Sequence, residues 1–312
     1  MTPFAFVFPG QGSQAVGMLD AWGDHAAVRQ TLAEASEALG EDIGRLIHAG
    51  PKEQLDLTTN TQPVMLTAGI ACYRAWIAET GLAPSVVAGH SLGEYSALVA
   101  AGSLTLAAAL PLVRFRAQAM QDAVPVGAGA MAAILGLDAQ TVRDVCAEVA
   151  AASGEVVAAA NFNDPKQTVI AGSKAGVDRA CAVLKAQGAK RALLLAVSAP
   201  FHSSLMKPAA VRLRERLAST ALVAPAIPVV NNIDVKAESD PALIRDALYR
   251  QAFGPVRWVE VVQAIRARGV SLIVECGPGK VLAGIVKRVD AEAVSGALFD
   301  QASLADVKGL LA

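Results

Sequence analysis

The chain has 312 residues with 27 basic and 28 acidic side chains, so its formal net charge at pH 7 is −1. Charges of both signs are mixed along the sequence, so it has no basic stripe of the kind that indicates a nucleic-acid partner. The hydrophobic fraction is 54%, yet no apolar run approaches the ~18 residues of a membrane span. The start of the chain lacks the basic segment and cleavage site of a signal peptide. These properties predict a soluble cytoplasmic protein that binds neither nucleic acid nor membrane.

The cysteines and histidines do not form a metal-ligand pattern. The four cysteines are far apart and lie in helix-like or strand-like runs, which favours buried, reduced thiols. We therefore expect no metal site, and nothing in the sequence requires a cofactor. The cysteines are Cys72, Cys146, Cys181 and Cys276, and the histidines are His25, His48, His90 and His202.

The first part of the chain alternates strands and helices, which predicts an α/β fold. A strand at 4–8 ends in the glycine-rich loop 9–14. The further elements expected before residue 125 are helices at 26–39 and 61–80, a strand at 85–88, and helices at 95–101 and 105–122.

The character of the chain changes near residues 124–127, where a different order of elements begins. The order strand, helix, strand, strand, helix, strand is that of a ferredoxin-like unit, so we expect a small ferredoxin-like subdomain over residues 126–198. Its expected elements are strands at 130–136, 156–163, 167–171 and 191–197 and helices at 139–152 and 175–187.

After this insert the α/β alternation resumes, with a final helix expected after residue 280. The whole pattern predicts a hydrolase-like parallel sheet flanked by helices, built from residues 1–125 and 199–312. The expected elements are a helix after His202, a strand at 227–231, helices at 241–253 and 259–268, and a strand at 271–275.

Residues 89–94, Gly-His-Ser-Leu-Gly-Glu, are the most informative segment. They follow an apolar strand and lead into a helix of small residues, which is the context of a nucleophile elbow. In such a tight turn the flanking positions need glycine, and the serine hydroxyl stands at the N-terminus of the next helix. This context predicts that Ser91 is a nucleophile.

A serine nucleophile needs a base within ~2.6–3.2 Å. His202 lies in a loop between a strand end and a helix start, where α/β enzymes place functional side chains, whereas His90 is adjacent to Ser91 on the turn and points elsewhere. Asp234 is the one tempting aspartate to orient the histidine. A serine–histidine dyad oriented by a backbone carbonyl is equally compatible with the sequence.

Arg116 indicates an anionic substrate group. Helical spacing places it beside apolar residues, with no acid at i±3 or i±4. A buried arginine without a partner is costly, and a bound carboxylate would satisfy it. An arginine that reaches solvent or a distant acid is the alternative.

Near the elbow, the Gln11 side chain and the Leu92 N–H are the candidate oxyanion donors.

The chain resembles the malonyl-CoA:acyl carrier protein transacylase family essentially end to end. Each matching segment is weak alone, but their number, order and spacing are distinctive. The segments are residues 8–14, 61–63, 89–94, Arg116 with Met120, residues 160–163, residues 200–203, Gln251 with residues 255–258, and residues 277–279.

The resemblance implies a ping-pong transfer of malonyl from malonyl-CoA to the phosphopantetheine thiol of holo acyl carrier protein, in fatty acid biosynthesis. Ser91 would carry the malonyl group, His202 would be the base, and Arg116 would bind the malonyl carboxylate. Gln11 and Leu92 would hold the oxyanion, and the Gln251 carbonyl would orient the histidine. The other residues implied are Gln62 and Asn161, lining the site, and Phe201, which resembles the family's malonyl-selecting pattern.

Three other functions share part of this pattern. A stand-alone acyltransferase of a polyketide synthase shares every motif, and a serine esterase or thioesterase shares the elbow. The third alternative is a non-catalytic carrier-protein binding module. Arg116 argues against a general esterase, and the intact set of site residues argues against a binding module. We expect a monomer.

Overall fold

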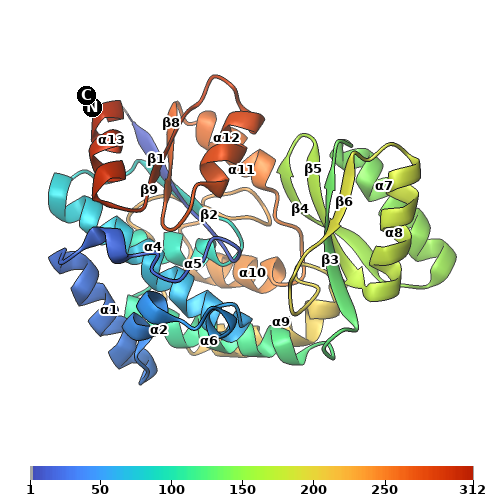
Figure 1. The fold of residues 1–312 in the computed structure, drawn as a ribbon, viewed down its shortest axis with the longest axis horizontal. Coiled ribbons are helices and arrows are strands. Elements are labelled where there is room, and N and C mark those ends of the chain that lie inside the picture. The colour runs from blue at the N-terminus through green and yellow to red at the C-terminus, as the bar shows by residue number, and fades with distance from the viewer. Residues whose placement is uncertain (1–2, 312) are drawn as a thin grey trace.

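The computed structural model describes residues 3–311, whose strands form two separate sheets (Figure 1). The larger sheet has five strands in the order β7-β2-β1-β8-β9, and all its neighbouring strands run parallel. Its strands are β1 (Phe4–Phe8), β2 (Val86–Gly89), β7 (Val229–Val230), β8 (Leu272–Cys276) and β9 (Val294–Leu298).

Helices cover both faces of this sheet, as expected for parallel strands, whose two faces are both buried. Alternate residues of β1 therefore enter different cores: Phe4, Phe6 and Phe8 pack on one face, and Ala5 and Val7 on the other. The second face is covered by α11 (Trp258–Arg266) and α12 (Val281–Val289). Helices that contribute to the first core are α1 (Ala26–Leu39), α2 (Ile43–Ala49), α3 (Lys52–Leu55), α4 (Thr58–Thr80), α5 (Gly93–Ala100), α6 (Leu106–Asp122), α9 (Lys207–Ala218), α10 (Pro241–Gln251) and α13 (Gln301–Leu311).

The smaller sheet is antiparallel, with the order β4-β5-β3-β6. One face packs on two helices (Figure 1), and the connectivity is the βαββαβ order of a ferredoxin-like unit, so the predicted fold class is confirmed. The boundaries at residues 126 and 198 stay a prediction. The elements are β3 (Gly129–Leu135), α7 (Ala139–Ser153), β4 (Val157–Asp164), β5 (Gln167–Ser173), α8 (Lys174–Ala186) and β6 (Arg191–Leu194).

Backbone hydrogen bonds join the small sheet to the large part of the molecule. The N–H of Phe162 donates to the carbonyl of Val256 at 2.9 Å, and the N–H of Val256 donates to the carbonyl of Ala160 at 2.8 Å. Arg288 of α12 adds an ion pair with Asp164 at 2.7 Å. The edge of β4 is therefore fixed against the segment before α11.

The C-terminal region differs from the expected single helix. After α12 the chain forms the edge strand β9 and then α13, so the large sheet has one more strand than the sequence predicted. Only Leu298 of β9 is fully buried, which explains why its apolar pattern was too weak to indicate a strand. Two predicted strands are also shorter than expected, since β6 ends at Leu194 and β7 has two residues.

Among residues 3–311, no helix combines the length and the apolar character that a membrane span requires.

Candidate active site

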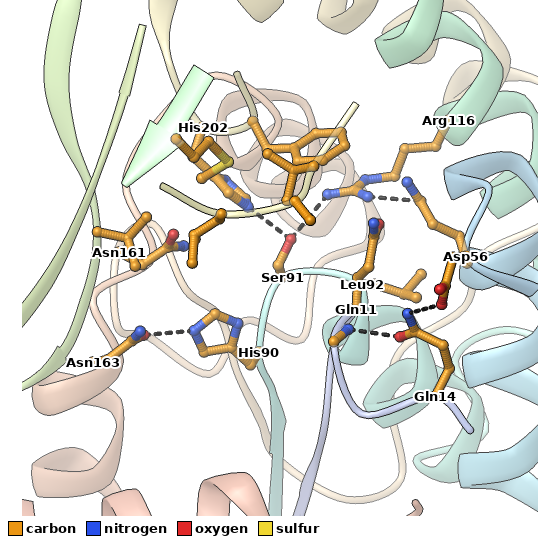
Figure 2. A pocket seen from close by; sticks show the side chains of 18 of the residues that line it. Gln11, Gln14, Asp56, His90, Ser91, Leu92, Arg116, Asn161, Asn163 and His202 are labelled. Atoms are coloured by element: carbon orange, nitrogen blue, oxygen red, sulfur yellow. Dashed lines mark hydrogen bonds between the residues drawn. The ribbon is translucent and has the colours of Figure 1, made fainter. Parts of the chain in front are cut away.

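A cavity of about 610 Å³ lies between the two sheets, lined by residues from both parts of the molecule. Figure 2 shows Ser91 in the middle of this cavity, with His202 and Arg116 approaching it from two sides. Gln251 does not line the cavity but is fully buried beside it. The predicted site residues that line the cavity are Gln11, Gln62, Ser91, Leu92, Arg116, Asn161 and His202.

Ser91 occupies a strained turn between β2 and α5. Its φ is +52°, in the left-handed region that non-glycine residues rarely adopt. The flanking glycines allow the turn to form, because a Cβ on Gly89 would overlap the backbone of Gly93, and a Cβ on Gly93 would overlap the Phe8 carbonyl. The predicted elbow geometry is present, and it holds the serine side chain out from the strand.

His202 lies within hydrogen-bond distance of the nucleophile, with Nε2 2.7 Å from Ser91 Oγ. Its Nδ1 faces the backbone carbonyls of Gln251 at 2.9 Å and Gly254 at 3.1 Å. Because carbonyl oxygens only accept, Nδ1 carries the proton and Nε2 presents its lone pair to the serine hydroxyl.

The environment of His202 keeps the imidazole neutral at physiological pH. Burial, and next the positive charge of Arg116, lower the pKa of His202 to about 3. A neutral imidazole with its lone pair towards the hydroxyl is the form that can remove a proton from serine.

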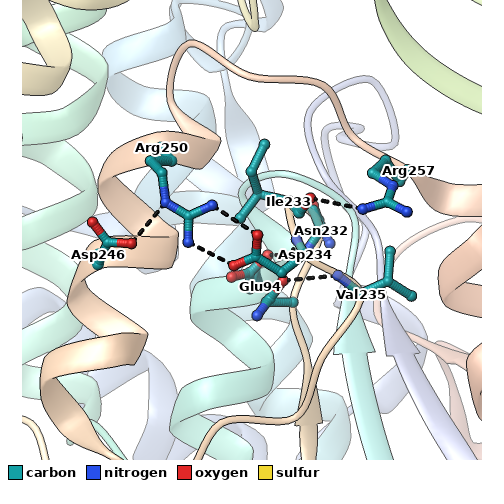
Figure 3. Close-up of polar contacts among 9 residues, drawn as sticks. Glu94, Asn232, Ile233, Asp234, Val235, Asp246, Arg250 and Arg257 are labelled. Carbon is teal, nitrogen blue, oxygen red and sulfur yellow. Dashed lines mark hydrogen bonds and ion pairs between the residues drawn. The ribbon is translucent and has the colours of Figure 1, made fainter.

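Asp234 does not orient the histidine, so this sequence-based option is wrong. Both of its carboxylate oxygens accept from Arg250, at 2.8 and 2.6 Å (Figure 3). Its own N–H donates to Asn231 Oδ1 at 2.8 Å. The arginine holds the pKa of Asp234 below its ordinary value. The Ser91–His202 pair is therefore a dyad oriented by backbone carbonyls.

Arg116 is buried and reaches the site from α6. It donates to Gln62 Oε1 at 2.7 Å, to Ser91 Oγ at 3.2 Å and to Gln251 Oε1 at 3.3 Å. Its Cζ also lies 5.5 Å from the centre of the Tyr95 ring. Neither a snorkelling geometry nor a carboxylate contact is present among residues 3–311. The guanidinium is instead held by neutral groups at the cavity, which leaves its charge available to an anionic ligand.

Two backbone or side-chain donors near Ser91 have no acceptor within the described part of the chain. One is the N–H of Leu92, which follows the nucleophile. The other is the amide nitrogen of Gln11, whose oxygen accepts from the Thr58 hydroxyl at 2.9 Å and so leaves the nitrogen free. Both residues line the cavity beside Ser91, where an oxyanion would develop.

The remaining predicted residues line the same space. Gln62 accepts from Arg116 and donates from Nε2 to Thr58 at 3.3 Å, so its amide orientation is fixed. Asn161 comes from β4 of the small sheet and is almost fully buried at the cavity (Figure 2). His90 is turned away from the nucleophile, since its Nε2 lies 2.8 Å from Asn163 Oδ1.

Sequence reasoning missed two residues beneath the elbow, Asn232 and Glu94. Asn232 accepts from the Ser91 N–H at 2.7 Å and donates to the Gly89 carbonyl at 2.8 Å. Glu94 is buried and forms no ion pair with any residue between 3 and 311, and burial raises its pKa to about 7. A glutamate inside the elbow motif, at a position that must be buried, was the available signal for this network.

A serine–histidine pair at an elbow is the arrangement of an α/β enzyme that takes an acyl group onto serine. The family model described as "Acyl transferase domain" matches residues 5–301. The chain therefore belongs to the acyl transferase family, and it is an acyltransferase.

Relatives with more specific names cover almost the whole chain. The malonyl CoA-acyl carrier protein transacylase of Escherichia coli is 53% identical over 306 residues, covering 98% of each chain. That of Bacillus subtilis is 45% identical over 291 residues, covering 93% of this chain and 91% of the relative.

Two solved structures show the same fold. The acyl-carrier-protein S-malonyltransferase of Burkholderia pseudomallei is 66% identical, with a TM-score of 0.96 over 98% of this chain and 99% of that one. A malonyl-transacylase in complex with the acyl-carrier protein of a type II polyketide synthase is 50% identical, with a TM-score of 0.95 over 97% and 98% of the two chains.

Proposed function

We propose that the protein transfers a malonyl group from malonyl-CoA to the phosphopantetheine thiol of holo acyl carrier protein, for fatty acid biosynthesis. The names of the relatives support this substrate and this partner. The observation that carries the proposal is the buried Arg116 guanidinium 3.2 Å from Ser91 Oγ, which suits an acyl group that ends in a carboxylate.

In the first half-reaction, Ser91 Oγ attacks the thioester carbonyl while His202 Nε2 takes the hydroxyl proton. The oxyanion of the tetrahedral intermediate is held by the Leu92 N–H and the Gln11 amide. The carbon–sulfur bond then breaks, His202 returns the proton to the sulfur, and coenzyme A leaves. The product is a malonyl ester of Ser91.

The second half-reaction runs the same steps in reverse. The phosphopantetheine thiol of the carrier protein gives its proton to His202 and attacks the ester carbonyl. The bond from the carbonyl carbon to Ser91 Oγ breaks, and the proton moves from His202 back to the serine. Because the site that held coenzyme A accepts the second thiol, the kinetics are ping-pong.

Selection of the malonyl group rests on Arg116 and on the shape of the cavity. The two terminal nitrogens of Arg116 bind the free carboxylate, and Gln62, Gln251 and Asn161 fix the surroundings. The ring of Phe201 lines the cavity next to the histidine and would crowd an α-methyl branch, an exclusion worth ~1–3 kcal/mol.

We propose further that the enzyme is a cytoplasmic monomer made of two subdomains, residues 1–125 with 199–312 and residues 126–198. The lining of the cavity by residues from the regions of both sheets supports a site at the junction of these subdomains. An alternative acceptor is the carrier protein of a polyketide synthase, since one structural neighbour is bound to such a carrier.

Mass spectrometry of the intact protein after brief incubation with malonyl-CoA tests this function. We expect a malonyl adduct on Ser91 that moves to holo acyl carrier protein and is absent from Ser91→Ala. Hydrolysis of malonyl-CoA without transfer would instead identify a thioesterase, and no adduct would overturn the proposal. Transfer rates to fatty acid and polyketide carrier proteins, compared side by side, distinguish the two acceptors.

A further inference from the structure

The carboxylate of Glu94 lies directly beneath the elbow and touches none of the reacting atoms. Glu94 is the second residue of α5, only 2% exposed, and a single oxygen, Oε2, accepts two hydrogen bonds. One comes from the backbone N–H of Asn232 at 2.8 Å, and the other from the side-chain nitrogen of Gln251 at 3.0 Å. These two donors belong to segments that are distant in sequence from each other and from the elbow.

The Asn232 branch supports the nucleophile. Figure 3 shows Asn232 beside Glu94, which accepts from its backbone N–H. The Asn232 side chain accepts from the Ser91 N–H and donates to the Gly89 carbonyl, so it holds both sides of the turn. Ser91 is held in a strained conformation at φ +52°, and such strain persists only where surrounding contacts over-determine it. The hydrogen bonds around Ser91 therefore depend on a backbone group that Glu94 fixes.

The Gln251 branch supports the base and the arginine. The Gln251 side-chain nitrogen also donates to the Ser91 carbonyl at 3.0 Å, and its oxygen accepts from Arg116 at 3.3 Å. The backbone carbonyl of the same residue accepts from His202 Nδ1. One glutamine at the end of α10 thus contacts the nucleophile Ser91, the base His202 and the cation Arg116 directly.

We propose that Glu94 is a positioning residue for acyl transfer. One of its carboxylate oxygens, Oε2, fixes Asn232 and Gln251, and through these two residues it sets the relative positions of Ser91, His202 and Arg116. This rests on the proposed function. Glu94 fixes these groups by accepting their hydrogen bonds. A neutral carboxyl or an amide also has an oxygen that can accept them.

Two substitutions of Glu94 separate its hydrogen-bond acceptance from its charge. Glu94→Gln keeps an oxygen where Oε2 accepts both hydrogen bonds, whereas Glu94→Leu fills a similar volume without an acceptor. In Glu94→Leu the Asn232 N–H and the Gln251 side-chain nitrogen would lose this acceptor. Because unpaired buried donors are costly, both groups would move to find other partners. A displacement of the reacting groups by ~1 Å costs about 100-fold in rate.

Glu275 provides a matched control elsewhere in the molecule. It is likewise fully buried, on β8, and its carboxylate accepts from the N–H of Ala283 at 2.9 Å at the start of α12. It does not line the cavity. Glu275→Leu therefore removes a buried acceptor of the same kind without touching the supports of the site.

The test measures the rate of Ser91 acylation in single turnovers by intact mass, with malonyl-CoA and with p-nitrophenyl acetate as donors. For Glu94→Leu we expect the rate at saturating malonyl-CoA to fall about 100-fold with KM within about 3-fold, and Glu94→Gln to stay within about 10-fold of the wild type. Glu275→Leu should acylate within about 3-fold of the wild type per folded molecule. Glu94→Ala replaces the leucine variant if that variant does not fold.

A folded Glu94→Leu or Glu94→Ala protein that acylates at the wild-type rate would overturn the proposal, and so would an equal loss in Glu94→Gln. A wild type that takes no malonyl from malonyl-CoA would overturn the proposed function instead. The ester donor still measures the reactivity of Ser91 in that case, so the two failures are distinguishable.

Discussion

The guanidinium of Arg116 donates a hydrogen bond to the hydroxyl oxygen of Ser91 at 3.2 Å, so the buried cation lies beside the nucleophile and not beside an acid. The other side chains that accept hydrogen bonds from it, Gln62 and Gln251, are neutral amides. Burial lowers the pKa of Arg116, and the negative charge of Glu94 is among the groups that oppose this. A second carboxylate, brought by the substrate, would compensate the charge directly.

This arrangement predicts that Arg116→Lys loses activity on malonyl-CoA far more than on acetyl-CoA. A lysine is a point charge without the planar fork that binds a carboxylate at two points. Losing one hydrogen bond to a charged group costs about 1.5–3 kcal/mol, so kcat/KM for malonyl-CoA should fall about 10- to 150-fold. Steady-state kinetics with both thioesters checks this, and a parallel loss on acetyl-CoA would show that the arginine acts on the nucleophile and not on the carboxylate.

The dyad predicts that Asp234→Asn leaves acylation within about 3-fold of the wild type. Removing the aspartate of a true triad costs about 10,000-fold in kcat. The carboxylate of Asp234, however, accepts hydrogen bonds from Arg250 and not from His202 (Figure 3). The lost pair is partly exposed, so the free energy of unfolding should change by only ~1 kcal/mol. Rate measurement and urea unfolding on the same preparation separate the two effects, and a large rate loss at unchanged stability would restore the triad.

The environment of His202 predicts a flat pH–rate profile in the mildly acidic range. Because burial and Arg116 lower the pKa of His202 to about 3, the free enzyme keeps a neutral base well below the ordinary value of about 6.5. The value of kcat/KM, which reports the free enzyme, should not fall as pH decreases through 6.5. Its loss should occur only nearer the lowered pKa, where His202 becomes protonated and stops accepting the serine proton.

Glu94→Gln is the control for this profile. The pKa of Glu94 is raised to about 7 by burial, so an inflection near neutrality that disappears in this variant belongs to the glutamate. An inflection near 6.5 that persists in both proteins would mean that His202 is solvated, contrary to its position in the structure.

The parts of the site that were predictable from sequence depend on local geometry. Ser91 was identified because a turn of that tightness needs glycine at positions 89 and 93, and the steric overlaps at both positions confirm this. His202 was identified from its place after a strand end. The groups that orient it were not identifiable, because the backbone carbonyls of Gln251 and Gly254 have no sequence signature.

The same distinction holds for the fold. Central strands such as β1 are buried along their whole length and show a continuous apolar run, while the edge strand β9 is mostly half-exposed and was missed. Asn232 was also not identifiable, since its role comes from contacts with Ser91 and Gly89, which lie more than 100 residues away along the chain.

The elbow also makes a prediction about stability. A Cβ on Gly93 would overlap the backbone carbonyl of Phe8 and crowd that of Pro9. Phe8 ends β1, which is hydrogen-bonded on both sides in the sheet, so its backbone has little freedom to retreat. We expect Gly93→Ala to lower the free energy of unfolding by at least ~3 kcal/mol, the upper range of overpacking costs.

Gly309 in α13 gives the opposite expectation from the same substitution. Among residues 3–311, no atom outside the neighbouring residues and the backbone of the same helix lies within 4 Å of a Cβ built there, so Gly309→Ala should stabilise the protein by about 0.5–1 kcal/mol through helix propensity. Urea unfolding of both variants, followed by far-UV circular dichroism, measures the two free energies against the wild type. Equal midpoints for Gly93→Ala and the wild type would mean that the strand and the elbow helix can separate, which would contradict the close approach of Gly93 to the Phe8 carbonyl.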